Sequence, residues 1–109
     1  MTDVLQVTTT TDNRDVALEL ARSAVQARLA AGGDVSGPNT SFFWHNGEFG
    51  TGEEWRLRLH TTRERYEALE AHLLERHPWS NPEISAVEVT AGASACVEWV
   101  AQSVTLGDL

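Results

Sequence analysis

The segment His77–Glu83 holds two prolines four positions apart, Pro78 and Pro82. Each proline lacks a backbone N–H donor and fixes φ, so neither fits the interior of a helix or of a central strand. Each also favours an extended conformation for the residue before it. We therefore expect a helix to end at His77 and a strand to follow the segment. Trp79 is held between these two rigid points, beside an imidazole and a carboxylate, and is a candidate for a ligand cleft or a subunit contact.

The hydrophobic pattern on either side of this segment predicts four strands and three helices. Alternating or β-branched residues are typical of strands, and apolar residues at a spacing of 3.6 are typical of helices. Asn46-Gly47 predicts a tight hairpin, because both central positions of a type I′ turn need φ > 0. The predicted strands are 4–11, 34–45, 48–60 and 84–90, and the predicted helices are 16–30, 64–77 and 93–104.

Short polar and glycine signals predict where the helices begin and end. Asp12 or Asn13 is a suitable N-cap for the first helix. Gly32-Gly33 should end that helix, since glycine is common just past a helix C-terminus. Thr61 and Glu64 have the spacing of a capping box for the second helix.

The order β-α-β-β-α-β with a terminal helix predicts an α+β, ferredoxin-like sandwich. The 109 residues suffice for one domain. In this arrangement both crossover helices lie on one face of the sheet. We expect the aromatic residues of the hairpin to line the other face, and an exposed apolar face usually contacts a partner. Trp44 and Trp55 are therefore expected in the core or in a contact between subunits.

The charge of the chain excludes several function classes. The net charge is −8 and all eight basic residues are arginine. An acidic chain repels phosphate backbones, so we expect no nucleic-acid partner. Without lysine there is no Schiff-base chemistry and no P-loop lysine. No apolar run approaches the roughly 18 residues of a membrane span, and we expect no membrane partner.

The single cysteine and the N-terminal residues favour a cytoplasmic protein. Cys96 cannot form an internal disulfide. We expect it to be a small buried hydrophobic residue of the terminal helix. The first residues lack the basic start and apolar run of a signal peptide.

Most of the chain, from about Val4 to Val104, resembles the CutA family of divalent cation tolerance proteins. The resemblance rests on five segments in a consistent order: the opening strand with Thr9 and the turn at Thr11-Asp12, then 27–31, 37–48, 59–62 and 77–83. It implies a ferredoxin-like protomer and a homotrimer formed by pairing of sheets and edge strands. It also implies a response to metal ions, copper among them, through weak binding of divalent cations, in a protein that is not an enzyme.

Three departures from the family pattern bear on the metal. Gly32 stands where the family often has a cysteine, and Thr8 or Thr9 lies where some members have a cysteine in the first strand. His60 stands where the family has a lysine. The remaining candidate metal ligands are His77 and Glu83, with His60 as an additional one. These ligands favour copper(II) or another borderline divalent cation over copper(I). Both of the first two also have structural interpretations: His77 as a cap of the helix C-terminus, and Glu83 as the partner of an arginine.

Two other function classes stay open. A small-ligand signalling trimer similar to the nitrogen-regulatory PII proteins would need a phosphate site, for which the chain offers only arginine. A metal-assisted enzyme with a cleft between subunits would need three protein ligands around a water-bearing metal. At most His60, His77 and Glu83 could supply them.

Overall fold

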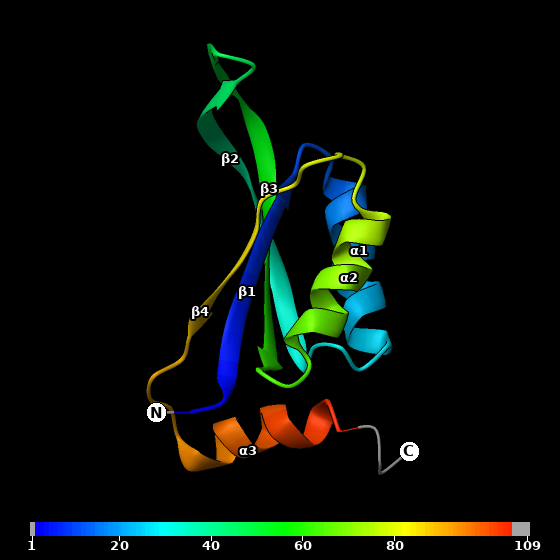
Figure 1. The fold of residues 1–109 in the computed structure, drawn as a ribbon, viewed down its shortest axis with the longest axis vertical. Coiled ribbons are helices and arrows are strands. Elements are labelled where there is room, and N and C mark those ends of the chain that lie inside the picture. Colours follow the sequence, from blue (N-terminus) through cyan, green and yellow to red (C-terminus); the bar gives the residue numbers. More distant parts are fainter. Residues whose placement is uncertain (1, 106–109) are drawn as a thin grey trace.

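Four antiparallel strands form the centre of the computed structural model, which describes residues 2–105. The strands are paired in the order β2-β3-β1-β4. Helices α1 and α2 cover one face of this sheet, and α3 lies across its lower end (Figure 1). The elements follow the predicted order: β1 (Val4–Thr11), α1 (Arg14–Gln26), β2 (Gly32–His45), β3 (Glu48–Thr62), α2 (Tyr66–Arg76), β4 (Ile84–Glu88) and α3 (Ser94–Ser103). None of the described helices is long and apolar enough to span a membrane.

The hydrophobic core lies between the sheet and the first two helices. Alternate residues of β1 and β3 point toward the helices, as the period of two in a strand requires. Burying one leucine or valine side chain contributes about 1.5–3 kcal/mol, so this layer supplies most of the stability of the fold. The buried side chains from strands and helices include Leu5, Val7, Leu57, Leu59, Ala17, Leu20, Ala24, Leu69 and Leu73.

The first helix begins where the sequence predicts but ends earlier. The Asn13 side chain accepts a hydrogen bond of 3.0 Å from the backbone N–H of Val16, which confirms Asn13 as the N-cap. The helix ends at Gln26, so the predicted end at Gly32-Gly33 is wrong. Both glycines instead begin β2.

Arg28, just past the cap of the first helix, adopts a backbone conformation that is usual for glycine. Its φ is 59°. The N–H of Leu29 donates to the carbonyl of Ala24 and the N–H of Arg28 donates to that of Val25, both at 3.0 Å. These two bonds form a Schellman motif with arginine at the left-handed position. The turn brings Leu29 back into the core.

The second helix begins without the predicted capping box. Thr61 is still part of β3, is buried, and donates its hydroxyl to the carbonyl of Leu29 at 2.7 Å. The helix begins at Tyr66, and its cap residue Arg65 makes no capping hydrogen bond through its side chain. The capping box is therefore wrong. The predicted C-terminal end is confirmed, since His77 follows the helix in an extended conformation with ψ 138°.

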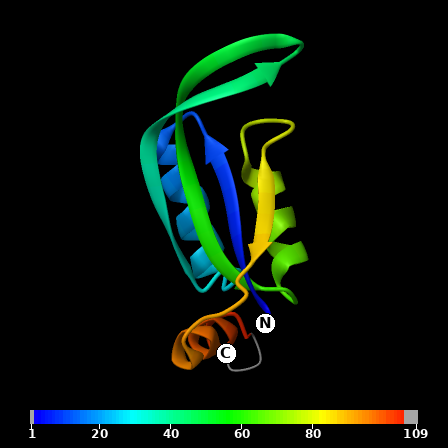
Figure 2. The ribbon, with the colours of Figure 1, turned by 90° about the vertical axis from the view of Figure 1, so that its left-hand side faces the viewer.

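The hairpin of β2 and β3 extends beyond the four-stranded sheet (Figure 2). β1 pairs with β3 only from Trp55 to Thr62, whereas β2 and β3 stay paired as far as the turn. An irregularity between Ser36 and Asn39 separates the two regions. The turn has φ of 51° at Asn46 and 79° at Gly47, which confirms the predicted type of turn. We call residues 39–54 the hairpin extension.

The face of the sheet that α1 and α2 leave open is mostly polar, with Val87 of β4 as an exposed apolar residue opposite Gln6. The register places the open-face residues of β1 beside those of β3 and β4, with Thr8 opposite both Arg58 and Ser85. The prediction of an aromatic open face is wrong, because the hairpin carries its aromatic residues past the end of the sheet. The open-face residues include Gln6, Thr8, Asp34, Arg58, His60 and Ser85.

The third helix covers the end of the sheet with Val100, which is buried together with Val104 just past the helix. The ring of Trp99 lies over Gly32, where an added Cβ would come within 3.0 Å of it. Cys96 is exposed, so the prediction that it is buried is wrong.

Candidate functional site

His77 connects the end of α2 to β1 through a hydrogen bond of its side chain. It is only 8% exposed. Its Nε2 lies 2.7 Å from the carbonyl oxygen of Thr10, and its Nδ1 lies 3.1 Å from the backbone nitrogen of Trp79. A carbonyl can only accept and a backbone N–H can only donate, so these partners assign the neutral ring with hydrogen on Nε2. Both ring nitrogens are therefore engaged within the protomer.

The three tryptophans named from the sequence have different surroundings. Trp79 is half-buried and its ring centroid lies 5.1 Å from that of His77, with the rings tilted by 54°. Trp55 is half-buried and packs against the hydrophobic core. Trp44 lies on the hairpin extension and is 76% exposed. Of the three, only Trp44 is mostly exposed.

His60 lies on the open face and is half-buried, opposite Gln6 in the register. Asp34 lies on the neighbouring strand β2, opposite Arg58. The pKa of Asp34 is lowered, mainly by hydrogen bonds from Arg58 at 2.9 and 3.2 Å, which prevail over partial desolvation, with smaller contributions from the charges of Arg58 and His60. The open face thus places an imidazole near an ionised carboxylate.

Glu83 is exposed and belongs to a loose ion pair. Its Oε1 lies 3.9 Å from Nη1 of Arg56. Within residues 2–105, no three His, Cys, Asp or Glu side chains are grouped so that they could hold a metal ion. The described protomer therefore does not gather His77, Glu83 and His60 into one metal site.

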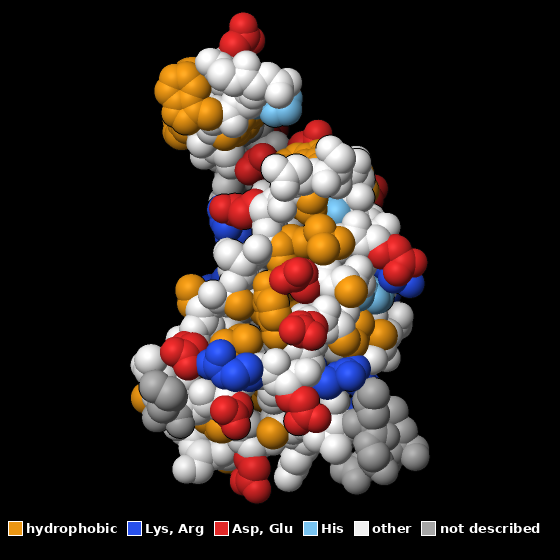
Figure 3. Space-filling model, viewed as in Figure 1, with side chains coloured by type: hydrophobic (Ala, Val, Ile, Leu, Met, Phe, Trp, Pro, Cys, Tyr) orange, Lys and Arg blue, Asp and Glu red, His pale blue; other side chains and the backbone are white. Residues whose placement is uncertain are grey.

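An exposed aromatic cluster lies on the hairpin extension. Phe42, Trp44 and Phe49 are 69%, 76% and 64% exposed. Phe42 stacks on Phe49 with ring centroids 6.3 Å apart, and Trp44 meets Phe49 edge-on at 6.0 Å. Figure 3 shows hydrophobic side chains gathered at this end of the molecule. We call these three residues the aromatic cluster.

The cluster could have been predicted from the turn. A two-residue turn at Asn46-Gly47 pairs Trp44 with Phe49, and period-two alternation then places Phe42 on the same side. Trp44 was predicted to lie in the core or in a contact between subunits, and the hairpin aromatics as a group were predicted on the open face rather than as a cluster beyond it.

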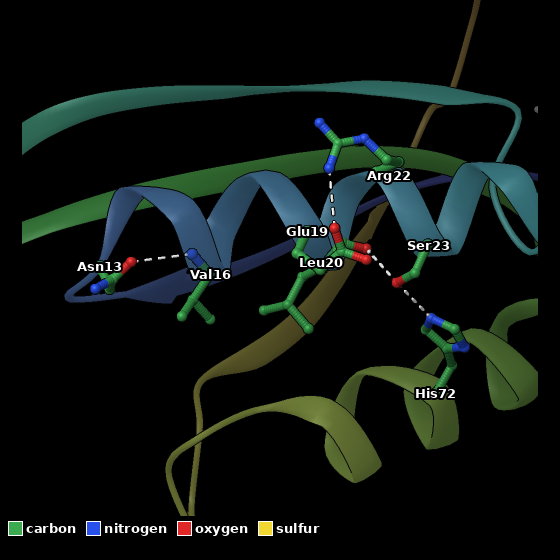
Figure 4. A network of polar contacts seen from close by, with 7 residues as sticks. All are labelled: Asn13, Val16, Glu19, Leu20, Arg22, Ser23 and His72. Atoms are coloured by element: carbon green, nitrogen blue, oxygen red, sulfur yellow. Dashed lines mark hydrogen bonds and ion pairs between the residues drawn. The ribbon is translucent and has the colours of Figure 1, made fainter.

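A serine and a histidine meet between α1 and α2. The Oγ of Ser23 lies 2.9 Å from Nε2 of His72 (Figure 4). A catalytic serine needs a histidine nitrogen that accepts its proton. Here Nη1 of Arg76 lies 3.2 Å from Nδ1 of His72 and can only donate, so Nε2 carries the hydrogen. Ser23 also lies within hydrogen-bond distance of the carbonyl of Leu20, at 3.1 Å. The pair is therefore not arranged to activate the serine.

Two shallow hollows lie near the start of α2. One, of about 600 Å³, contains the ion pair of Arg63 and Glu88. It also contains Tyr66, whose pKa is raised to about 12, first by burial and then by its hydrogen bond with Glu70. The second, of about 740 Å³, is lined by equal numbers of basic and acidic residues, namely Arg63, Arg65, Asp3 and Glu64. Because acidic residues balance the arginines, neither hollow has the charge that a phosphate group requires.

The chain is similar in sequence and structure to known proteins. A family model described as CutA1 divalent ion tolerance protein matches residues 5–103. A Thermotoga maritima protein named divalent-cation tolerance protein CutA is 28% identical over 101 residues, which cover 93% of this chain and 99% of that protein. An Arabidopsis thaliana protein named protein CutA, chloroplastic, is 30% identical over 94 residues. These cover 86% of this chain but 52% of the plant protein, so the chain spans about half its length. The crystal structure of CutA from Xylella fastidiosa matches with a TM-score of 0.92 at 27% identity, covering 95% of this chain and 100% of that one.

Proposed function

The chain belongs to the CutA1 family of divalent ion tolerance proteins, and from this membership we propose that it is a ferredoxin-like homotrimer that binds divalent cations weakly. Copper(II) is the cation that we expect it to prefer. The observation that supports cation binding most directly is the open sheet face, which carries the imidazole of His60, whereas the carboxylate of Asp34 on the same face is already paired with Arg58. Imidazole and carboxylate are suitable ligands for borderline divalent ions. The net charge of −8 per chain also attracts cations.

The aromatic cluster supports assembly. Three large aromatic side chains that are mostly exposed on a two-stranded extension form an unusual surface for a monomer. Burying each would contribute about 1.5–3 kcal/mol before the cost of association. The outer edge of β4 is also unpaired within the described protomer and can accept another strand. We propose that these surfaces join protomers and that a neighbouring protomer completes the ligand set of the cation.

The contacts of the three candidate metal ligands separate those that are free to bind a cation from the one that supports the fold. Both ring nitrogens of His77 are engaged with Thr10 and Trp79, which supports a structural role for this residue. Glu83 is exposed and is paired loosely with Arg56, so it can turn toward a cation at little cost. The proposal therefore assigns cation binding to His60 and Glu83, with His77 holding in place the segment 77–83 between α2 and β4, which we call the connector.

We further propose that the protein is cytoplasmic and does not catalyse a reaction. A lone cysteine is compatible with a reducing compartment. The direction of the hydrogen bonds around His72 argues against a serine nucleophile. The pairing of Arg63 with Glu88 argues against a signalling site for a phosphate ligand.

Calorimetric titration of the purified protein with copper(II), zinc(II) and calcium(II) tests the cation site. We expect His60→Ala to weaken copper(II) and zinc(II) binding and to leave the weak attraction of calcium(II) unchanged. His45→Ala is the matched control, because His45 is an exposed histidine beside the hairpin turn, where its Nε2 lies 3.2 Å from the side-chain amide of Asn46. Equal loss of copper(II) affinity in the two variants, or no loss in His60→Ala, would remove His60 from the proposed site.

A further inference from the structure

A directional chain of hydrogen bonds joins α2 to α1. Nη1 of Arg76 lies 3.2 Å from Nδ1 of His72, whose Nε2 lies 2.9 Å from Oγ of Ser23. The Ser23 hydroxyl in turn lies 3.1 Å from the carbonyl oxygen of Leu20. Figure 4 shows Ser23 on α1 pointing at the His72 ring on α2. The contact between Ser23 and His72 is partly buried, whereas the contact between His72 and Arg76 is exposed.

The guanidinium at one end of this series of hydrogen bonds can only donate and the carbonyl at the other end can only accept, which fixes the direction of the bonds between them. The guanidinium of Arg76 donates, so Nδ1 of His72 accepts and Nε2 carries the hydrogen. Nε2–H then donates to Ser23, whose hydroxyl donates to Leu20. The arrangement therefore requires a neutral imidazole. A second proton can bind only at Nδ1, where it would replace the hydrogen bond from Arg76 with two cationic groups facing each other.

The other charged groups near His72 do not cancel this effect. On α2, Glu75 favours the protonated ring. On α1, Glu19 lies one turn from Ser23 but is paired with Arg22 at 2.9 Å. The pKa of His72 is lowered from 6.5, first by burial and then by the positive charge of Arg76, against the smaller effect of Glu75.

We propose that the hydrogen-bonded residues Arg76, His72 and Ser23 form a pH-sensitive contact between α2 and α1. The contact stabilises the packing of the two helices while His72 is neutral and weakens when His72 binds a proton. Such a device would act on the helix that leads directly into the connector and β4. It is independent of the proposed cation site, because none of its residues lies on the open face or in the connector.

The sign of the pH dependence follows from linkage. The folded state disfavours the protonated ring, whereas the unfolded chain protonates it at about pH 6.5. The contribution of His72 is therefore fully present above pH 6.5. It is lost progressively as the pH falls from there through the lower pKa of the folded state.

NMR titration of the His72 ring, combined with amide hydrogen exchange of α2, tests the proposal on the full-length protein. We expect His72 to titrate below pH 6.5. After correction for intrinsic exchange rates, α2 amides should lose protection relative to β1 amides between pH 7.5 and pH 5.5. His72→Gln should remove this differential loss, because glutamine can still donate to Ser23 but does not titrate. His45→Gln, at the exposed hairpin turn, should keep it.

Arg76→Gln gives a second variant, because it removes the cation that faces Nδ1 and leaves the core intact. We expect the His72 titration to move to higher pH in this variant. The proposal would be overturned if His72 of the wild-type protein titrated above pH 6.5. An ion pair between protonated His72 and Glu19 would have that effect. Equal differential loss in wild-type protein and His72→Gln would also overturn it.

Discussion

Replacing His77 with alanine should destabilise the protein by about 2–6 kcal/mol while leaving copper(II) binding unchanged. The side chain makes two hydrogen bonds, to the Thr10 carbonyl at 2.7 Å and from the Trp79 N–H at 3.1 Å. Each contributes about 0.5–1.5 kcal/mol. The Thr10 carbonyl would also lose its imidazole partner. This position is largely shielded from water, because His77 is only 8% exposed. A buried polar group without a partner costs about 1–3 kcal/mol, which brings the sum to the range given.

Urea denaturation at a fixed protein concentration measures this cost, because any assembly makes the apparent stability depend on concentration. His77→Gln should recover part of the loss, since its amide can still donate toward Thr10. His45→Ala should change the free energy of unfolding by no more than about 0.5 kcal/mol, as is usual for exposed positions. A loss below about 0.5 kcal/mol in His77→Ala, together with weakened copper(II) binding, would show that His77 is a ligand and refute the structural role.

Three further substitutions test the local structure and the assembly surface. Asn13→Ala removes the cap hydrogen bond to Val16 and should cost about 1 kcal/mol in urea denaturation. Arg28→Gly should be neutral or stabilising by up to about 1 kcal/mol in the same assay, because glycine adopts φ of 59° without strain. A clear loss of stability would show that the hydrogen bond from Arg28 to the Ser103 carbonyl outweighs the relief of strain. Trp44→Ser should shift the sedimentation coefficient toward smaller species. Leu74→Ser, at an exposed position of α2, should leave that coefficient unchanged.

The order of elements could be predicted because the apolar spacing of each segment is local information. Leu57 and Leu59 alternate with arginines and are buried as that alternation indicates. Asn46-Gly47 set the register of the hairpin, since its turn geometry depends on these two residues alone. Pro78 and Pro82 likewise separate α2 from β4 without help from the rest of the fold.

The features that could not be predicted depend on contacts between distant segments. Thr61 looked like a helix cap, but its hydroxyl reaches the carbonyl of Leu29, 32 residues earlier. Arg28 ends α1 in a conformation for which glycine is the usual signal, and the burial of Leu29 explains why the chain turns there. His72 had no partner in the sequence, because Ser23 lies 49 positions away on another helix.

The location of the aromatic residues is the difference that matters most for function. The pattern of the hairpin predicted aromatic side chains on the open face, but β2 and β3 continue past the end of β1. The cluster therefore lies on the hairpin extension, and the open face is left mostly polar with His60 near Asp34. Strand length and the irregularity at Ser36 to Asn39 decide this placement, and neither follows from alternation alone.

Native mass spectrometry of the protein with and without copper(II) tests the central proposal most directly, because one spectrum reports both the assembly and the bound ions. One chain has a mass of 12.0 kDa, so three chains give about 36 kDa. We predict a species of about 36 kDa that gains copper(II), and a His60→Ala form of the same mass that gains less. A 12.0 kDa species at micromolar concentration, or a trimer whose copper(II) uptake is unaffected by His60→Ala, would contradict the account.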